Sequence, residues 1–379
     1  MRTWDAKKLT DESDWSNDNG RPRLWIHTGA GPRAGFGHLR RCMVLAAELG
    51  DQVQTCFVLR MRDRWSGGSL KARGFTYVRE DLANIWTRMP RPAAILIDTR
   101  LREDLDDFIL TARQRNIPVM SLHDLGLNPL ATDIAIDGSI APMFSQDFEV
   151  ARTFGGPTYM VLDPVFQELH RRPLSIRGEI RSVVVSLGGG DAREHFWRVL
   201  KGLRLWATRS ERAIKVVGMR GFVDWGQEQF NEEALRPLCF RWESKPVGAF
   251  LRDADLAITA GGISAYEALC AGTPLLAMVG DSLQQTTVRR IAAAGGCVNL
   301  GVGRELAQEQ LAELIGKIDA DASVREKFAR RGRKIVDGLG AVRVASIIRR
   351  TIEYGLDGLG GGNRIVQPDA SGNLLGLAG

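Results

Sequence analysis

Cysteine is scarce in this chain, and the few that occur follow no metal or disulfide pattern. The 379 residues include five cysteines, an odd number, and no two of them form a C-x-x-C pair. Neither a zinc-ligand spacing nor a disulfide framework can be built on them. We therefore expect reduced thiols in the core, no metal, no cofactor and a cytoplasmic location.

Long apolar runs and basic blocks are also missing. No apolar stretch reaches the ~18 residues that a membrane-crossing helix needs, and residues 1–19 are too polar for a signal peptide. The net charge is +6, but the arginines are dispersed and no basic block alternates with aromatic residues. We expect no membrane span and no nucleic-acid partner, and we assign the excess charge to the surface and to phosphate-binding positions.

An alternation of short apolar strands and helical patterns is present, and it predicts an α/β protein with doubly wound parallel sheets. A chain of this length is typical of two domains, and the alternation of strand and helix patterns is interrupted at Pro164 and Pro173. We predict a disordered tail at 1–20, an N-terminal domain at 21–162, a linker at 163–181, a C-terminal domain at 182–355 and a flexible tail at 356–379. The expected helices include 102–116, 193–206, 305–319 and 323–354.

The segment from Gly35 to Cys42, G-F-G-H-L-R-R-C, is the first candidate for chemistry. It follows an apolar strand at 24–26 and a turn, and it opens a helical pattern that continues to Leu49. A strand, a glycine turn and a helix start expose backbone N–H groups at the carboxyl edge of a parallel sheet. His38 is the side chain there that can exchange a proton near neutral pH. It is either a general base that faces a ligand or a structural histidine that caps the first turn or supports the loop.

Two further glycine turns lie in the second half, at 186–191 and 260–264. Each follows an apolar strand and precedes a helix, so its N–H groups and the helix dipole favour phosphate oxygens. Glu267 follows Ser264 by three residues and can accept two hydrogen bonds from a ribose diol. The competing explanation is that the glycines only make tight turns and that Glu267 pairs with a surface arginine. Together with the His38 segment, the turns favour a ligand between two domains.

Four segments together resemble one family of nucleotide-sugar hydrolases. They are G-F-G-H-L-R-R-C at 35–42, S-L-G-G-G-D at 186–191, A-G-G-I-S-A-Y-E-A-L-C-A-G-T-P at 260–274 and D-S-L-Q-Q at 281–285. The family is the UDP-2,4-diacetamido-2,4,6-trideoxy-β-L-altropyranose hydrolases of pseudaminic acid biosynthesis, which are related to spore-coat polysaccharide proteins. The resemblance runs from Arg23 to Tyr354 and implies the GT-B fold, with two Rossmann-like domains facing each other across a cleft.

The resemblance also implies a role for each matched residue. His38 would be the base that activates water against the anomeric carbon of a UDP-activated deoxy-amino sugar, with inversion. Gly37 would let the substrate approach, Arg41 would fix the loop or bind the anion, and Asp98 would contact substrate. The uridine diphosphate is expected at Gly188, Gly189, Gly261, Gly262, Ser264 and Glu267, and Gln284 stands where the family has the glutamine of an N-Q pair. The implied partners are a UDP-sugar and other enzymes of glycan biosynthesis.

The chain departs from the family pattern on the side that contacts the sugar. Gly29-Ala30-Gly31 stands where the family has D-A-S, Leu283 replaces the N of N-Q, and Thr99 follows Asp98. These departures keep two alternatives open: a GT-B glycosyltransferase with a UDP-sugar donor, and a non-catalytic nucleotide-sugar-binding protein. A nicotinamide-dependent dehydrogenase is disfavoured, because no strand-G-x-G-x-x-G-helix is followed by an acidic residue ~20 positions later.

Overall fold

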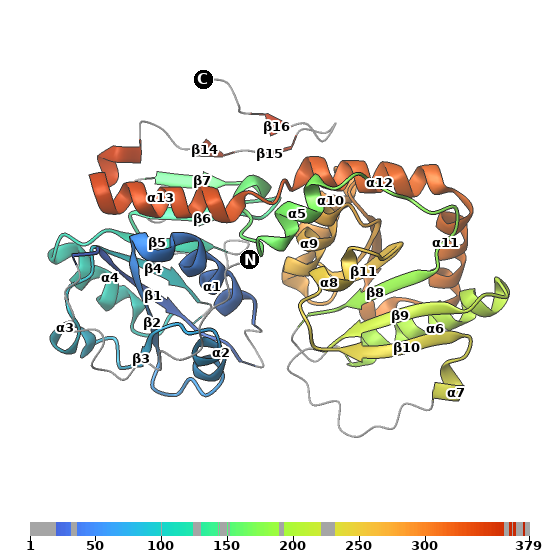
Figure 1. Cartoon of the computed structure of the whole chain (residues 1–379), viewed down its shortest axis with the longest axis horizontal. Helices are drawn as coiled ribbons and strands as arrows, with labels where there is room; N and C mark the ends of the chain where they lie inside the picture. Colours follow the sequence, from blue (N-terminus) through green and yellow to red (C-terminus); the bar gives the residue numbers. More distant parts are fainter. Residues whose placement is uncertain are drawn as a thin grey trace. The chain divides into compact units, whose positions relative to one another are not determined.

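The computed structural model of the protein divides into two compact units (Figure 1). The first comprises Met1–Val161 and Leu339–Ile365, and the second comprises Leu162–Gly338 and Val366–Gly379. The structure describes residues 20–31, 36–99, 101–123, 130–142, 144, 150, 152–188, 193–220, 232–359, 364–365, 367–368 and 374–375. Each unit is treated by itself below.

The first unit is built on an eight-stranded sheet whose described strands pair in parallel. Across the sheet the strands are β14 (Arg364–Ile365), β7 (Arg152–Gly155), β6 (Ile134–Asp137), β5 (Val119–His123), β4 (Ala94–Asp98), β1 (Arg23–Thr28), β2 (Gln54–Leu59) and β3 (Tyr77–Arg79). The helices of this unit are α1 (Gly37–Leu49), α2 (Ser66–Ala72), α3 (Ile85–Arg88), α4 (Leu105–Gln114) and α13 (Gly340–Tyr354). The strand order reverses between β4 and β1, which makes their carboxyl ends the expected place for a ligand.

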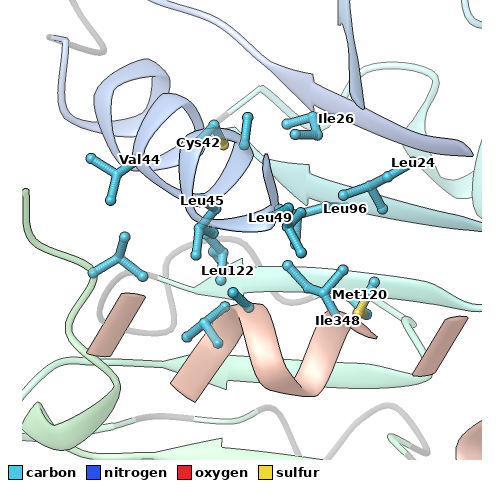
Figure 2. Packing of buried hydrophobic residues seen from close by; sticks show 14 of the residues in the cluster. Leu24, Ile26, Cys42, Val44, Leu45, Leu49, Leu96, Met120, Leu122 and Ile348 are labelled. Atoms are coloured by element: carbon cyan, nitrogen blue, oxygen red, sulfur yellow. The ribbon is translucent and has the colours of Figure 1, made fainter. Parts of the chain in front are cut away.

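Alternation along β1 and β4 sorts their side chains to the two faces of this sheet, because neighbouring residues of a strand point to opposite sides. Leu24 and Ile26 of β1 and Leu96 of β4 belong to the core cluster that includes α1. Trp25 and Ile97 belong to a second cluster on the other face, with α4. Figure 2 shows the first cluster, in which α1, β1, β4, β5 and α13 contribute side chains.

Helix α13 lies late in the sequence yet completes the first unit. Val344, Ala345 and Ile348 of α13 are buried in the same cluster as α1 (Figure 2). The sequence predicts one helix over 323–354 inside the C-terminal domain. The structure instead has α12 (Ala322–Ile335) and α13, separated where Gly338 takes a φ of +76°. Glycine adopts that conformation without steric cost, so it ends the helical path and lets the chain re-enter the first unit.

The second unit has a six-stranded sheet, and its strands also pair in parallel. Across the sheet the strands are β10 (Leu238–Glu243), β9 (Ile214–Met219), β8 (Ser182–Ser186), β11 (Leu256–Ala260), β12 (Leu275–Val279) and β13 (Val298–Val302). The helices are α5 (Val165–Arg171), α6 (Arg193–Arg209), α7 (Glu232–Leu235), α8 (Gly248–Leu251), α9 (Ile263–Ala271), α10 (Gln285–Ala293), α11 (Gln308–Ala320) and α12. The strand order reverses between β8 and β11, the two strands that precede the predicted glycine turns.

Several segments differ from the expectations for the linker and tail. The range 163–181 lies within the second unit and contains helix α5. Beyond residue 355 the chain forms a 3₁₀ turn at Leu356–Leu359, and β14 pairs with β7. Two further short strands, β15 (Gln367–Pro368) and β16 (Leu374–Leu375), pair antiparallel. Residues 1–19 lie outside the described part of the chain.

Sequence reasoning missed β3, β7, β10 and β13. Strands β3, β10 and β13 lie at sheet edges, and β7 has only the two-residue β14 beyond it. An edge strand is less buried than a central one, so it needs fewer apolar side chains and leaves a weaker pattern. In β10, for example, the burial alternates along the strand, whereas β4 is buried throughout.

His27, on the face of β1 opposite α1, is fully enclosed and is expected to make the protein acid-sensitive. Its Nδ1–H donates to the carbonyl oxygen of Val58 at 2.9 Å, and its Nε2 is buried without a hydrogen-bond partner among the described residues. Burial, helped by the Arg60 cation, lowers the pKa of His27 from 6.5 to about 4. As pH falls from 6.5 to about 4, His27 therefore binds a proton in the unfolded chain but not in the folded chain.

We expect this difference to remove about 3 kcal/mol of unfolding free energy between pH 7 and pH 4. Denaturant unfolding across that range measures it, with His27→Gln as the comparison. Glutamine does not titrate and keeps an N–H for Val58, so the pH curve of the variant should be flatter than that of the wild type. Parallel curves would show that another group causes the acid sensitivity.

Candidate active site

Asp98 is the last residue of β4 and lies on the face of the first sheet that packs against α1. Ala94 and Leu96 belong to the α1-side cluster, and Asp98 continues the same alternation. The register of the sheet pairs Asp98 with Thr28 at the end of β1. Asp98 therefore lies at the point where the strand order reverses, next to the start of α1.

Three side chains of α1 converge on Asp98. His38, Arg41 and Cys42 share one face of the helix, because residues three and four positions apart lie above one another. His38 Nδ1 lies 2.6 Å from Asp98 Oδ1. Arg41 donates from Nε to Oδ2 at 2.5 Å and from Nη2 to Oδ1 at 2.6 Å. The thiol of Cys42 completes the set by donating to Oδ2 at 3.5 Å.

These contacts fix the charge of Asp98 and the tautomer of His38. The side chain of Asp98 is 0% exposed. Burial alone would raise the pKa of its carboxyl group, but Arg41 and His38 outweigh burial and hold that pKa well below its usual range. An ionised carboxylate only accepts hydrogen bonds, so Nδ1 of His38 carries the proton and donates it. The lone pair of the neutral ring is then on Nε2.

Nε2 is the ring atom left for a ligand. The hydrogen bond of His38 is at Nδ1, which also lies 3.1 Å from Arg41 Nη2, and within the described ranges no residue binds its Nε2. A buried carboxylate that orients an imidazole and leaves the opposite nitrogen open is the arrangement of a general base. The structural alternative of a helix cap is not supported, since Phe36 is the N-cap residue of α1 and no side chain caps that end.

The structure corrects the role predicted for Asp98. Both carboxylate oxygens bind protein donors inside the core, so Asp98 positions His38 and Arg41 and does not present a surface to substrate. Arg41 is itself buried and holds this network. Its two predicted roles, fixing the loop or binding the anion, stay predictions. Gly37 is the first residue of α1. Gly35 lies outside the described residues.

Arg41 also lines a small pocket in the first unit. Its walls include Asp137 at the end of β6, the next residues Gly138 and Ser139, and Tyr159–Val161. The backbone of Met160 lies so close to Gly138 that a Cβ there would be 2.6 Å from its Cα, and only glycine fits. The pocket therefore lies beside the Asp98 network, at the same carboxyl edge of the sheet.

In the second unit, the predicted glycine residues fall at the carboxyl ends of β8 and β11. Gly188 has a φ of +92° and open space where a side chain would lie, so the turn after β8 needs glycine for its conformation. A Cβ on Gly261 would lie 2.7 Å from Val288, whereas one on Gly262 would meet nothing within 4 Å. Gly261 is therefore a packing residue, and Gly262 faces open space. Gly189 lies outside the described residues.

Gln284 holds the turn after β11. Its Oε1 accepts from the backbone N–H of Gly261 at 3.1 Å and from that of Gly280 at 3.2 Å. This corrects one expectation, because the N–H of Gly261 is occupied by Gln284 and is not available to a phosphate. No residue in the described part of the chain binds the amide NH₂ of Gln284, which leaves that group for a ligand.

The start of α9 keeps the features of an anion site. No side chain caps this end of the helix, so its first N–H groups and the helix dipole can receive an anion. The hydroxyl of Ser186 at the end of β8 donates to that of Ser264 in the first turn of α9 at 3.0 Å, which links the end of β8 to the start of the helix. Glu267 is only 2% exposed and has interactions inside the protein. Its predicted contact with ribose stays a prediction.

Comparison with known proteins adds relatives in sequence and in structure. No family model matches the chain. A spore coat polysaccharide biosynthesis protein, SpsG of Bacillus subtilis (strain 168), is 29% identical over 272 residues, which are 69% of this chain and 74% of that protein. MurG of Acinetobacter baumannii has a TM-score of 0.63 at 13% identity, with 86% of this chain and 99% of that one covered. CalG4, the calicheamicin glycosyltransferase, has a TM-score of 0.55 at 16% identity, with 89% and 99% covered.

The chain has the GT-B fold. This confirms the fold class that the sequence predicted, two doubly wound α/β sheets. In this GT-B chain the His38 network and the α9 start each lie at a carboxyl edge where the strand order reverses, the place where open parallel sheets bind ligands. Each candidate site therefore lies, within its own unit, at the edge of the sheet where ligand binding is expected.

The described residues show neither a metal-ion cluster nor a membrane-crossing helix. Within the ranges described above, no group of His, Cys, Asp and Glu side chains is arranged to hold a metal ion. Among the same residues, no helix combines the length and apolar character needed to cross a bilayer.

Proposed function

We propose that this protein hydrolyses a UDP-activated deoxy-amino sugar at its anomeric carbon, releasing UDP and free sugar with inversion. The observation that carries the proposal is the His38–Asp98 pair: a buried ionised carboxylate 2.6 Å from Nδ1, with Nε2 unoccupied by the described residues. The deoxy-amino character of the sugar rests on the motif resemblance. The proposed nucleotide site rests on the α9 start and Gln284.

His38 would remove a proton from water in the reaction. Its Nε2 accepts the proton as the water oxygen forms a bond to the anomeric carbon, and the bond from that carbon to the diphosphate oxygen breaks. Both bonding electrons leave with UDP. The Asp98 carboxylate stabilises the imidazolium that forms at His38, since the two charges meet in a buried site. Attack from the face opposite the diphosphate inverts the anomeric centre.

The second unit would stabilise the leaving group. The uncapped N–H groups at the start of α9 and the dipole of that helix favour the charge that develops on the diphosphate. Gly262 has no atoms within 4 Å of a would-be side chain, so a phosphate can approach the backbone there. The Ser264 hydroxyl and the amide NH₂ of Gln284 are further donors. Gly188, Gly189 and Glu267 complete the proposed nucleotide site.

The relatives support a broader statement than hydrolysis. The names of the Bacillus subtilis protein and of CalG4 refer to polysaccharide biosynthesis and to glycosyl transfer. We therefore place this chain among nucleotide-sugar-using proteins of polysaccharide biosynthesis, and we propose water as the acceptor.

A panel of nucleotide-sugars tests the proposal. The purified full chain is incubated with UDP-sugars that differ in the amino and deoxy positions, and released UDP is measured with and without candidate acceptor sugars. Full-rate release of UDP and free sugar without an acceptor supports hydrolysis, and proton NMR of the first product reports the inversion. Release that requires an acceptor would make the chain a transferase. Binding without any release would make it a non-catalytic binder.

Replacing Gln284 by leucine is expected to weaken UDP binding by roughly ten- to a hundredfold. The change removes the acceptor for two backbone N–H groups, those of Gly261 and Gly280. Leaving such groups unpaired costs about 1–3 kcal/mol, and here it loosens the turn before α9. Calorimetric titration with UDP measures the effect.

The matched control is Gln285→Leu. Gln285 is the next residue and exposed, and it begins α10. The control should bind UDP as the wild type does. Equal affinity in the Gln284 and Gln285 variants would show that the turn after β11 does not hold the nucleotide.

A further inference from the structure

A pocket lined by arginines lies in the second unit, away from the glycine turns. Its walls are the end of α5 and the segment after it, the residues before β11 and β12, and helix α12. Five of the lining residues are Arg172, Arg177, Arg252, Arg325 and Arg333. We refer to this cavity as the arginine pocket.

The arginine pocket lies at the opposite edge of the sheet from the proposed nucleotide site. Its lining includes Asp255 and Pro274, which directly precede β11 and β12. Both strands are parallel to β8, so their amino ends share one edge and their carboxyl ends share the other. β11 spans five residues, or ~16 Å at ~3.3 Å per residue. A ligand in the arginine pocket would therefore not be part of the nucleotide site.

Two of the pocket arginines bind backbone carbonyls and have no carboxylate partner in the ranges that the structure covers. Arg325 is 1% exposed and donates to the carbonyls of Ile318, Asp319, Arg177 and Gly178. Arg333 donates to those of Arg172, Leu169 and Ala271, and its Nε is buried without a hydrogen-bond partner. Burial lowers the pKa of Arg333 from its ordinary value, which is the sign of a cation that lacks a compensating charge.

Two arginines outside the pocket, the buried Arg41 and the partly buried Arg212, have a carboxylate beside them. Arg41 binds Asp98, and Arg212 binds Asp319. In the arginine pocket the lining carboxylate is Asp255, whose oxygens already accept from Arg177, from two backbone N–H groups and from the Ser182 hydroxyl. Arg252 also has a carboxylate beside it, Asp253 at 3.5 Å. The pocket thus keeps three arginines, Arg172, Arg325 and Arg333, for which the structure shows no carboxylate partner among the described residues.

Capping of helix ends explains part of this arrangement. Arg333 binds carbonyls at the ends of α5 and α9, and Arg325 binds carbonyls at the end of α11. A cation at a helix C-terminus is favourable. Capping does not account for the unpartnered Nε of Arg333, nor for Arg172 and Arg252, which are exposed and line the same cavity.

We propose that the arginine pocket binds a small phosphate-type dianion, as free phosphate or as the phosphate group of a monoester. Arginines from three chain segments line the cavity, and guanidinium matches phosphate oxygens in charge and geometry. The ligand would connect the segment after α5 with the residues before β11. Binding would stabilise the folded state by an amount that rises with the logarithm of ligand concentration above Kd.

Calorimetric titration of the full chain tests the proposal at constant ionic strength, with inorganic phosphate in one arm and glycerol phosphate in the other. Saturable one-to-one binding is expected. Arg172→Ala with Arg252→Ala should weaken it at least about tenfold, since charge-assisted hydrogen bonds are lost. These side chains are exposed, so the variant should fold. Stronger binding of the monoester would identify a phosphorylated small molecule as the ligand, and equal binding would identify the free anion.

Two controls separate this site from others. Arg204→Ala with Arg330→Ala removes the same charge from exposed positions outside the pocket and should leave affinity within twofold. Ser264→Asp adds a carboxylate at the proposed nucleotide site and should also leave it unchanged. Non-saturable binding, equal losses in the two arginine pairs, or loss in the Ser264 variant would each overturn the proposal. Failure of UDP to bind would leave it intact.

Discussion

Replacing His38 by alanine or phenylalanine is expected to lower kcat by roughly 10²–10⁴-fold, the usual range for loss of a general base. UDP affinity should be nearly unchanged, because the proposed nucleotide site lies in the other unit. The physical reason is that no other described side chain on this face of α1 can replace His38 as a base, because Arg41 and Cys42 both donate to Asp98. UDP release under saturating donor measures kcat, and calorimetry measures UDP binding.

His170→Ala is the matched control for the His38 variants. His170 is the sixth residue of α5 in the second unit, so its loss removes an imidazole without touching the His38–Asp98 pair. Its turnover should match that of the wild type. If the His38 variants kept wild-type kcat, the histidine would have no part in the reaction and the proposed mechanism would fail.

Asp98→Asn is expected to lower both turnover and stability. An asparagine amide can donate to Nδ1 of His38, which moves the ring proton to Nε2 and removes the base, so kcat should fall about as far as in the His38 variants. The change also removes a buried ion pair, since Arg41 is 7% exposed and binds both carboxylate oxygens of Asp98. That loss costs about 3–5 kcal/mol of unfolding free energy.

Asp319→Asn separates the two effects of the Asp98 variant. Asp319 is a buried carboxylate of the second unit that pairs with Arg212 and accepts from the backbone N–H of Ile180. Its amide should lose stability without losing turnover. An Asp98 variant that unfolds more easily yet turns over at the wild-type rate would show that the carboxylate only supports the fold.

The central strands and their glycine turns could be predicted from the sequence, because their signals are local. An apolar run such as residues 94–97 reports its own burial, and the turn at 260–264 reports the start of a helix. The fold class follows from the repetition of such units. Edge strands such as β10 mix apolar and polar residues, and they were not predicted for that reason.

The contacts of the site could not be predicted in the same way. His38 and Asp98 are 60 residues apart, and their contact depends on β1 and β4 being neighbours, which local patterns do not specify. The available signal was an acidic residue, Asp98, at the end of a buried apolar strand. From the sequence we expected Asp98 to contact the substrate, whereas in the structure it binds His38. Gln284 likewise lies 23 residues from Gly261, whose N–H it occupies.

Helix α13 has a consequence for how the chain is made. The strands β1 to β7 of the first unit are translated before the second unit, but part of the core of the first unit, with Val344 and Ile348, belongs to residues translated after Leu162–Gly338. The second unit can therefore mature while the first still exposes apolar surface around α1. The core of the first unit is therefore completed last, and a chain truncated before α13 would leave that core open.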